Sequence, residues 1–384
     1  MESIIKLLKF CGFWGRPYQK FSLWQPLCHI AVLVVCLLAP GVIFIVRNSS
    51  NFASAISAAI ESMGFINTIL LGTTMLYHRS ALENAYGDIR IALRIGKSSS
   101  IGDVQRNIEF LEKSTNFLFK GYTVFQSVVG TGYALTIPSL TVVYYVQTGQ
   151  WPPLHGIFEA DFFVFDFTTN VWLWVLVIAV GMFAMLCLIS VLVIVSSFNW
   201  SFLHYIIGLF KLVHIRISRL NAFANPQSRQ MELIEIVKLQ ELVYRCARTA
   251  EDTLNLFLLT QFGTCVVAIC LTMMTLTLAS NDQDLLIKMI LMLAYILFNI
   301  FVYSMLGEEL IATSTSLAEA AYGTQWYEWS IPEQRNILFI VRRSQKTAAL
   351  TTGKFFAVNR STFAATLQAA YSNFTVLRQM VHSH

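Results

Sequence analysis

Polar side chains interrupt the last apolar stretch of this chain, close to its C-terminal end. The stretch 369–380 contains six of them, namely Tyr371, Ser372, Asn373, Thr375, Arg378 and Gln379. Polar groups at membrane depth are rare, and they usually face water or other protein groups. We therefore expect this final helix to line a water-filled path.

The same stretch carries a stripe of mostly small residues at helical spacing. Steps of three or four residues from Val376 place six side chains on one face: Ala365, Ala369, Ser372, Val376, Gln379 and Met380. Small residues let helices approach one another closely. The stripe would allow four such helices to meet at a common axis, and the alternative is a packing stripe with no pore.

A membrane setting follows from the composition, because the chain is far more apolar than an average soluble domain. Its 384 residues are 55% hydrophobic and 13% charged. A crossing helix needs about 20 mostly apolar residues. Seven segments meet this requirement: 27–46, 52–77, 121–146, 171–198, 254–279, 285–306 and 361–381. The sequence therefore predicts an all-α membrane protein with seven transmembrane helices.

The basic residues indicate how these helices are oriented. Four Lys and Arg residues precede the first helix, and the segments 78–120 and 199–253 contain seven each. The loops on the other side, 47–51, 147–170 and 280–284, contain one basic residue, Arg47, and Lys288 lies just inside the sixth helix. Because basic loops stay in the cytoplasm, we expect a cytoplasmic N-terminus and an extracellular C-terminus. This orientation is opposite to that of G-protein-coupled receptors and argues against a metabotropic receptor.

Charged and apolar residues alternate at helical spacing in the segments between the spans. The segments 82–120 and 203–253 show this pattern, which predicts that long spans continue beyond the membrane as amphipathic helices. The segment 308–353 has the same character, with breaks near Gly323 and Pro332. We expect this region to pack against neighbouring subunits, and a solvated intracellular loop is the alternative.

Spaced motifs in 306–380 resemble the C-terminal signature of the insect odorant receptor family. They are Leu306-Gly307, Ala321-Tyr322, Trp326-Tyr327-Glu328-Trp329, Arg342-Arg343-Ser344-Gln345-Lys346, Leu350-Thr351-Thr352-Gly353-Lys354-Phe355, Ser361-Thr362-Phe363 and Ala370-Tyr371-Ser372-Asn373-Phe374-Thr375-Val376-Leu377. Two positions depart from the family pattern: Thr347 stands where proline is usual, and Ala370 where serine or threonine is common.

The resemblance implies a ligand-gated, nonselective cation channel subunit in the plasma membrane of olfactory sensory neurons. It would form a heterotetramer with the shared odorant receptor co-receptor. Three regions follow: 1–306 with the cytoplasmic N-terminal segment, six helices and the odorant pocket, 307–350 as a cytoplasmic anchor, and 351–384 as the pore-lining helix and extracellular tail. The seventh helix is then split into an anchor part and a pore-lining part.

The resemblance also implies roles for residues of the pore-lining helix. The family places an apolar constriction at the position of Val376, and a hydrophobic ring can stop ions by dewetting. Ser372, Gln379 and Met380 would lie beside this gate in the pore.

A small volatile is expected to bind among the outer halves of the second, third, fourth and sixth helices, if the family pattern holds. The candidate ligand-binding residues are Ile60, Met63, Gly64, Gly132, Tyr133, Thr136, Trp172, Leu173, Leu176, Tyr295 and Phe298. Aromatic side chains with a few hydroxyls suit a small, mostly apolar ligand that can contain a ring. Each of these residues could equally be core packing.

Glu61 lies between the candidates Ile60 and Met63 in the second helix and carries a charge. A charge in a membrane helix is expensive unless it is paired, hydrated or protonated. We expect a structural partner within the bundle in preference to direct contact with the ligand.

Other motifs point to no different chemistry. The sequence pairs no nucleophile with a base and shows no zinc-ligand spacing, so we expect no enzyme, no metal, no cofactor and no nucleic-acid partner. Two alternative functions remain: a gustatory-type receptor channel that assembles alone, and a metabotropic seven-helix receptor or transporter.

Overall fold

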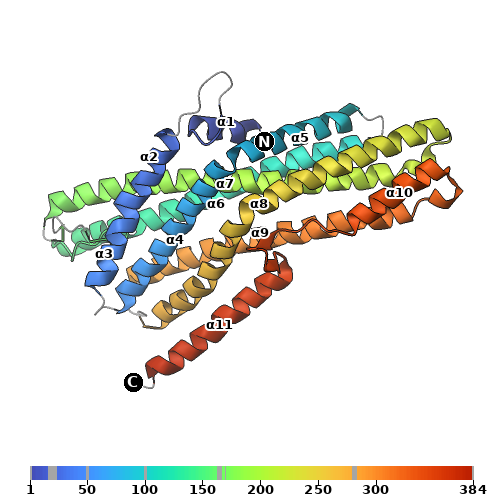
Figure 1. Ribbon diagram of the computed structural model, residues 1–384. Helices are drawn as coiled ribbons and strands as arrows, with labels where there is room; N and C mark the ends of the chain where they lie inside the picture. Colours follow the sequence, from blue (N-terminus) through green and yellow to red (C-terminus); the bar gives the residue numbers. More distant parts are fainter. Residues whose placement is uncertain are drawn as a thin grey trace.

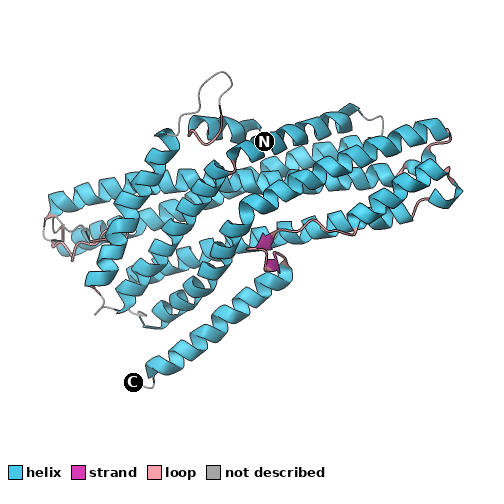
Figure 2. Ribbon diagram, in the orientation of Figure 1, coloured by secondary structure: helices cyan, strands magenta, loops and turns pink. Residues whose placement is uncertain are grey.

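Long helices make up nearly all of the structure, a computed structural model. It describes residues 2–15, 24–48, 52–98, 102–161, 167–168, 170–278 and 283–382. The side chain of Met380, a predicted pore residue, lies outside what is described. Figure 2 shows helices throughout, with one short pair of strands in these residue ranges.

The elements follow one another in a simple order (Figure 1). The N-terminal half contains α1 (Glu2–Phe10), α2 (Trp24–Leu33), η1 (Val34–Leu38), α3 (Ala39–Arg47), α4 (Phe52–Tyr77), α5 (Arg79–Ser98), α6 (Gly102–Thr148) and α7 (Val171–Ser218). The C-terminal half contains η2 (Leu220–Ala222), α8 (Pro226–Leu278), α9 (Gln283–Tyr322), η3 (Trp326–Glu328), α10 (Ile331–Ser344), β1 (Thr351–Thr352), β2 (Phe356–Ala357) and α11 (Arg360–His382).

The first apolar segment is one membrane-length unit with an irregular centre. The π-helical turn η1 joins α2 to α3, and Pro40 stands at the start of α3. Proline has no N–H for the preceding turn, and a π-turn inserts an extra residue into a helix. The whole unit spans Trp24–Arg47 and contains the predicted span 27–46.

Four helices extend well beyond the thickness of a membrane. α6, α7, α8 and α9 contain 47, 48, 53 and 40 residues. At 1.5 Å per residue they are about 60–80 Å long, roughly twice the hydrocarbon core of a bilayer. They run along a common direction in Figure 1, with α7 packed against both α6 and α9. The apolar spans therefore continue as helices, as the amphipathic flanking segments predict.

α7 forms the centre of this bundle. Every residue from 191 to 203 is buried. A helix that is apolar on all sides is stable only when other helices surround it. Its neighbours include α6, α8 and α9, and also α1, α2, α4 and α5.

The helices are apolar enough to identify a membrane protein. Six of those described are long and apolar enough to cross a bilayer: Trp24–Arg47, Ser54–Tyr77, Gly102–Thr148, Val171–Ala222, Pro226–Thr277 and Leu285–Tyr322. They contain four of the first six predicted spans in full, and they contain 52–77 and 254–279 except for residues 52, 53, 278 and 279. The seventh, α11, has 23 residues but is more polar, with Arg360 and Arg378 near its ends.

The region between α9 and α11 turns back on itself. α9 passes through the expected boundary at 306 and 307 without a break and ends at Tyr322, directly before Gly323. α10 begins at Ile331, with Pro332 in its first turn, and lies along α9. The two sequence breaks therefore mark the turn between α9 and α10.

Candidate functional site

A cavity of about 70 Å³ lies inside the bundle between α4, α6, α7 and α9. This volume is enough for several water molecules or a small organic group. Its lining is mostly apolar, and consists of Glu61, Gly64, Phe65, Thr68, Gln126, Val129, Gly130, Tyr133, Phe158, Met185, Leu188, Leu192, Leu291, Met292 and Tyr295. A mostly apolar cavity with a few polar groups is typical of a small-molecule site.

Helical periodicity places these side chains on facing surfaces. Gln126, Gly130 and Tyr133 lie one and two turns apart on α6, and so share a face. Gly130 stands where α6 meets α7, since a Cβ atom there would lie 2.5 Å from Cδ1 of Ile189. The missing side chain lets the two helices approach closely beside the cavity.

The segment that precedes α7 closes the cavity with an aromatic side chain. The ring of Phe158 packs edge-on against Phe65, with their centroids 5.2 Å apart, and lies 6.0 Å from the ring of Tyr133. Ile157 is buried next to it. The Nε1–H of Trp174 donates to the carbonyl of His155 at 2.9 Å and so holds the segment against α7.

Charged side chains form a compact cluster at one edge of the cavity. The ammonium of Lys288 on α9 lies 3.3 Å from Oε1 of Glu61 on α4, and 3.5 Å from Oε1 of Glu159. The hydroxyl of Tyr133 donates to Oε1 of Glu61. The backbone N–H of Glu159 donates to Oε2 of Glu61 at 3.0 Å. One ammonium thus pairs with two carboxylates inside a largely apolar bundle, and the cluster carries a formal charge of −1 when all three groups are ionised.

A second, smaller cavity of about 20 Å³ lies between α4, α8 and α9. It is lined by Ile60, Met63, Gly64, Asn67, Gln261, Thr264, Cys265, Ala268, Met292, Tyr295 and Ile296. The two cavities share Gly64, Met292 and Tyr295, and a Cβ atom at Gly64 would lie 3.1 Å from the methyl group of Met292. Methionine has a flexible, unbranched side chain, so Met292 is an adaptable wall between the cavities.

α11 presents one face to the bundle and the opposite face outward. Ala370 and Phe374 are buried, and Phe374 packs with Cys270 and Met274 of α8. Ser372 and Val376 each lie two residues further on, which is about 200° around the helix. Both are exposed in the single chain, and Val376 is 55% exposed. Ala365, Ala369 and Gln379 of the predicted stripe are also exposed.

The start of α11 is attached to two different helices. In the β1–β2 hairpin, the backbone N–H of Gly353 donates to the carbonyl of Asn255 on α8 at 3.0 Å. The backbone N–H of Arg360 donates to Oε2 of Glu308 on α9 at 3.2 Å. A Cβ atom at Gly307 would lie 2.1 Å from the carbonyl oxygen of Val358, so this crossing requires glycine.

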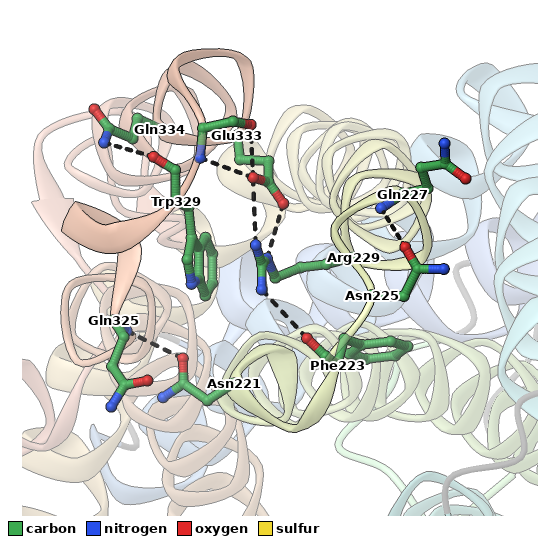
Figure 3. Close-up of polar contacts among 10 residues, drawn as sticks. Asn221, Phe223, Asn225, Gln227, Arg229, Gln325, Trp329, Glu333 and Gln334 are labelled. Carbon is green, nitrogen blue, oxygen red and sulfur yellow. Dashed lines mark hydrogen bonds and ion pairs between the residues drawn. The ribbon is translucent and has the colours of Figure 1, made fainter.

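The turn between α9 and α10 is joined to α8 by a buried ion pair (Figure 3). The Nε–H of Arg229 donates to Oε1 of Glu333 at 2.8 Å, and its guanidinium lies 4.6 Å from the ring centre of Trp329. Glu333 also accepts from Ser330 in the capping box that begins α10. Burial raises the pKa of the Glu333 carboxyl, but the bonds from Arg229 and Ser330 outweigh it, and the pKa is lowered.

Comparison with known proteins decides the family. A family model described as 7tm Odorant receptor matches residues 51–371, which is most of the chain. The chain belongs to this odorant receptor family. The family assignment confirms the resemblance carried by the C-terminal motifs.

A solved structure has the same fold as this odorant receptor. It is the insect olfactory receptor OR5 from Machilis hrabei in complex with eugenol, with a TM-score of 0.81 and 19% sequence identity over 99% of this chain and 97% of that one. At this identity the match concerns the fold alone.

Individual relatives match over shorter stretches. Odorant receptor 9a of Drosophila melanogaster is 24% identical over 227 residues, which is 59% of this chain and 55% of the relative. Odorant receptor 85b of the same species is 27% identical over 148 residues, or 38% of each chain. The Odorant receptor coreceptor of Anopheles gambiae is 34% identical over 88 residues, or 23% of this chain and 18% of the relative. The chain thus aligns with about half or less of these curated relatives.

Five of the predicted ligand-binding residues line the cavities of this odorant receptor. Gly64, Tyr133 and Tyr295 line the main cavity. Ile60 and Met63 line the smaller one. The expected helices, which are α4, α6, α7 and α9, are those that surround the main cavity.

The other six candidates lie elsewhere in the odorant receptor. Trp172 is 85% exposed and Leu176 is also exposed, while Leu173 packs with the cluster around Trp174. Thr136 donates its hydroxyl to the carbonyl of Gly132 within α6. Phe298 packs in the core, and its ring centre lies 4.1 Å from that of Phe125.

Most of the residues that could not be predicted from the sequence lie further along α4, α6 and α7 than the candidates do. The full set is Phe65, Thr68, Gln126, Val129, Gly130, Phe158, Met185, Leu188, Leu192, Leu291 and Met292. On α6 and α7 they continue the helical faces of the candidates toward the other end of each helix, whereas Leu291 and Met292 lie one turn before Tyr295 on α9. The available signal was Gln126, a polar residue within an apolar span.

Proposed function

We propose that this odorant receptor is a subunit of an odorant-gated, nonselective cation channel. A small volatile binds in the main cavity and opens a pore that α11 lines. The observation that carries the proposal is that α11 has two different faces. Phe374 on one face packs against α8, whereas Val376 on the opposite face is exposed in the single chain. An amphipathic membrane helix with one face docked on its own chain has the other face free for a shared axis.

In this proposal α11 crosses the membrane as a seventh helix and the C-terminus is extracellular. Residues 1–306 hold the ligand site, 307–350 supply the cytoplasmic anchor and 351–384 line the pore. α9 joins the first two regions as one continuous helix. Val376 forms the gate, flanked by Ser372, Gln379 and Met380.

The proposed partner is the odorant receptor co-receptor, in a heterotetramer in the plasma membrane of olfactory sensory neurons. Exposed apolar residues on α10 support an intersubunit contact in the anchor. Ile331, Leu338 and Phe339 lie seven and eight residues apart and share one exposed face. Such a face suits burial against a neighbouring subunit.

Simple energetics limits how completely one ligand opens the gate. A volatile of about ten heavy atoms gains on the order of 8 kcal/mol, which is close to micromolar affinity. Moving a gate from 1:99 to 99:1 needs about 5.5 kcal/mol of differential affinity. We therefore expect incomplete opening at saturation, and single-channel recordings with an open probability near one would contradict this.

Electrical recording tests the proposed channel. The chain is expressed with and without the co-receptor, G-protein signalling is blocked, and a panel of volatiles is applied. The proposal expects a cation current that needs the co-receptor. A current with this chain alone would instead favour a gustatory-type channel, and a response that disappears with G-protein signalling would favour a metabotropic receptor.

Cysteine accessibility tests the pore face directly. Ser372→Cys, Val376→Cys and Gln379→Cys are compared with Thr366→Cys and Ala370→Cys on the buried face of α11. Water-soluble thiol reagents should change the current through the first three variants and leave the last two unchanged. If the thiol reagents reach none of the five cysteines, at rest or during stimulation, α11 does not line a water-filled pore.

A further inference from the structure

Gln126 lines the main cavity and carries a buried hydrogen-bond acceptor with no partner among the described residues. Its side chain lines the cavity and is 3% exposed. Its Oε1 atom has no hydrogen-bond partner among the described residues. A buried acceptor without a donor costs free energy, so a ligand that donates to Oε1 would bind with an advantage.

Nearby polar groups of the cavity are already engaged. Thr68 donates its hydroxyl to the carbonyl of Gly64 at 2.9 Å. Tyr133 donates to Glu61, which in turn pairs with Lys288. The one cation of the cluster, Lys288, is already paired with the carboxylates of Glu61 and Glu159, so it is not left to attract an anionic ligand.

The rest of the lining favours an apolar ligand body. Val129 and Gly130 separate Gln126 from Tyr133 on the same face of α6, and Leu188 and Leu192 come from α7. Met185 and Met292 add flexible side chains that can adjust to the ligand's size. The cavity therefore combines an adaptable apolar wall with the acceptor of Gln126, which has no partner among the described residues.

We infer that the cavity binds a small, mostly apolar molecule with a hydroxyl group, an alcohol or a phenol, whose O–H donates to Oε1 of Gln126. This inference rests on the proposed role of the cavity as the odorant site. It adds a ligand class and a residue that determines specificity.

Matched ligand pairs and a matched pair of variants test the inference. The probes are benzyl alcohol and hexan-1-ol, each beside its methyl ether, which keeps the apolar body but has no O–H. Gln126→Met removes the acceptor at similar side-chain length, and Gln126→Glu retains an acceptor. The full chain with its co-receptor is assayed by current, and the purified complex by thermal stabilisation.

The expected result is a selective loss. Wild type should prefer each alcohol to its ether, and Gln126→Met should weaken the alcohols about 3- to 10-fold, the range for one neutral hydrogen bond. The ethers should change less than about twofold, and Gln126→Glu should keep the preference for alcohols. Equal loss for alcohols and ethers would overturn the inference, as would no response to either alcohol in both assays.

The two assays separate this inference from the proposed channel. Gln126-dependent stabilisation by alcohols without any current would uphold the ligand class and refute the channel. A co-receptor-dependent current with no preference for alcohols over ethers would uphold the channel and refute the ligand class.

Discussion

The ammonium nitrogen of Lys288 lies 3.3 Å from Oε1 of Glu61, and the two side chains are 1% and 4% exposed. This pair joins α9 to α4 at the edge of the ligand cavity. The partner that Glu61 needs is therefore a structural one within the bundle. Glu159 completes the cluster from the segment that closes the cavity.

Removing one member of the Glu61–Lys288 pair should destabilise the receptor strongly. Lys288→Met leaves the buried carboxylate of Glu61 and the part-exposed carboxylate of Glu159 without a cation, and breaking a buried pair costs about 3–5 kcal/mol. The double variant Glu61→Gln with Lys288→Met should regain part of this loss, because the only carboxylate of the cluster left without its cation is then Glu159, which is 21% exposed. Thermal unfolding of the purified receptor complex measures both, and additive losses in the double variant would show that the two residues are not coupled.

The junction of α8 and α10 should weaken at acidic pH through Glu333. Arg229 and Ser330 lower the pKa of Glu333 in the folded protein. The carboxylate therefore contributes stability above the pKa of the unfolded chain, near 4.5, and this contribution is lost as pH falls through the lower folded value. Unfolding temperatures measured from pH 7 to pH 3 should fall less steeply for Glu333→Gln than for wild type. Glu328→Gln, at an exposed neighbour, serves as the control and should follow wild type.

The two faces of α11 should respond differently to substitution. Val376→Ser places a hydroxyl where the proposed gate excludes water, so the channel should leak cations without odorant. Phe374→Ala instead removes a buried ring from the contact with α8 and should destabilise the docking of α11 by about 3 kcal/mol. Resting current and surface expression distinguish the effects. A leak from Phe374→Ala with a silent Val376→Ser would reverse the assignment of the faces.

Gly307 should tolerate no side chain. The Cβ atom of Gly307→Ala would lie 2.1 Å from the carbonyl oxygen of Val358, which is too close for any contact. The segment before α11 must then move away from α9, and surface expression or gating should be lost. Gly121→Ala is the matched control, since a Cβ atom there meets nothing within 4 Å. Normal expression and currents from Gly307→Ala would show that this crossing is not tight in the membrane.

Much of the fold could be predicted because apolar length and helical period are local properties. The span 52–77 coincides with α4, and the breaks at Gly323 and Pro332 coincide with the turn before α10. The partner of Glu61 could not be named, because Lys288 lies far away in the sequence. A need for pairing can be predicted from one residue, whereas the identity of the partner depends on the packing.

The depth of the cavity could not be predicted either. Trp172, Leu173 and Leu176 were expected to face a ligand at the outer end of α7. Trp172 and Leu176 instead lie on an exposed face of α7, and the segment before α7 covers another face, with Leu154 packed near Trp174 and Phe158 over the cavity. That segment has no helical or strand periodicity, so its path could not be derived from the sequence, and its packing leaves the cavity further along the helices.

The two attachments of α11 make it a lever. Its hairpin is fixed to α8 at Asn255, and its first turn is fixed to α9 at Glu308. Leu291, Met292 and Tyr295 of α9 line the main cavity, and α8 contributes no lining residue there among those described. A displacement of α9 relative to α8 would therefore move one attachment of α11 and not the other, and the strain would reach the contact of Phe374 with α8.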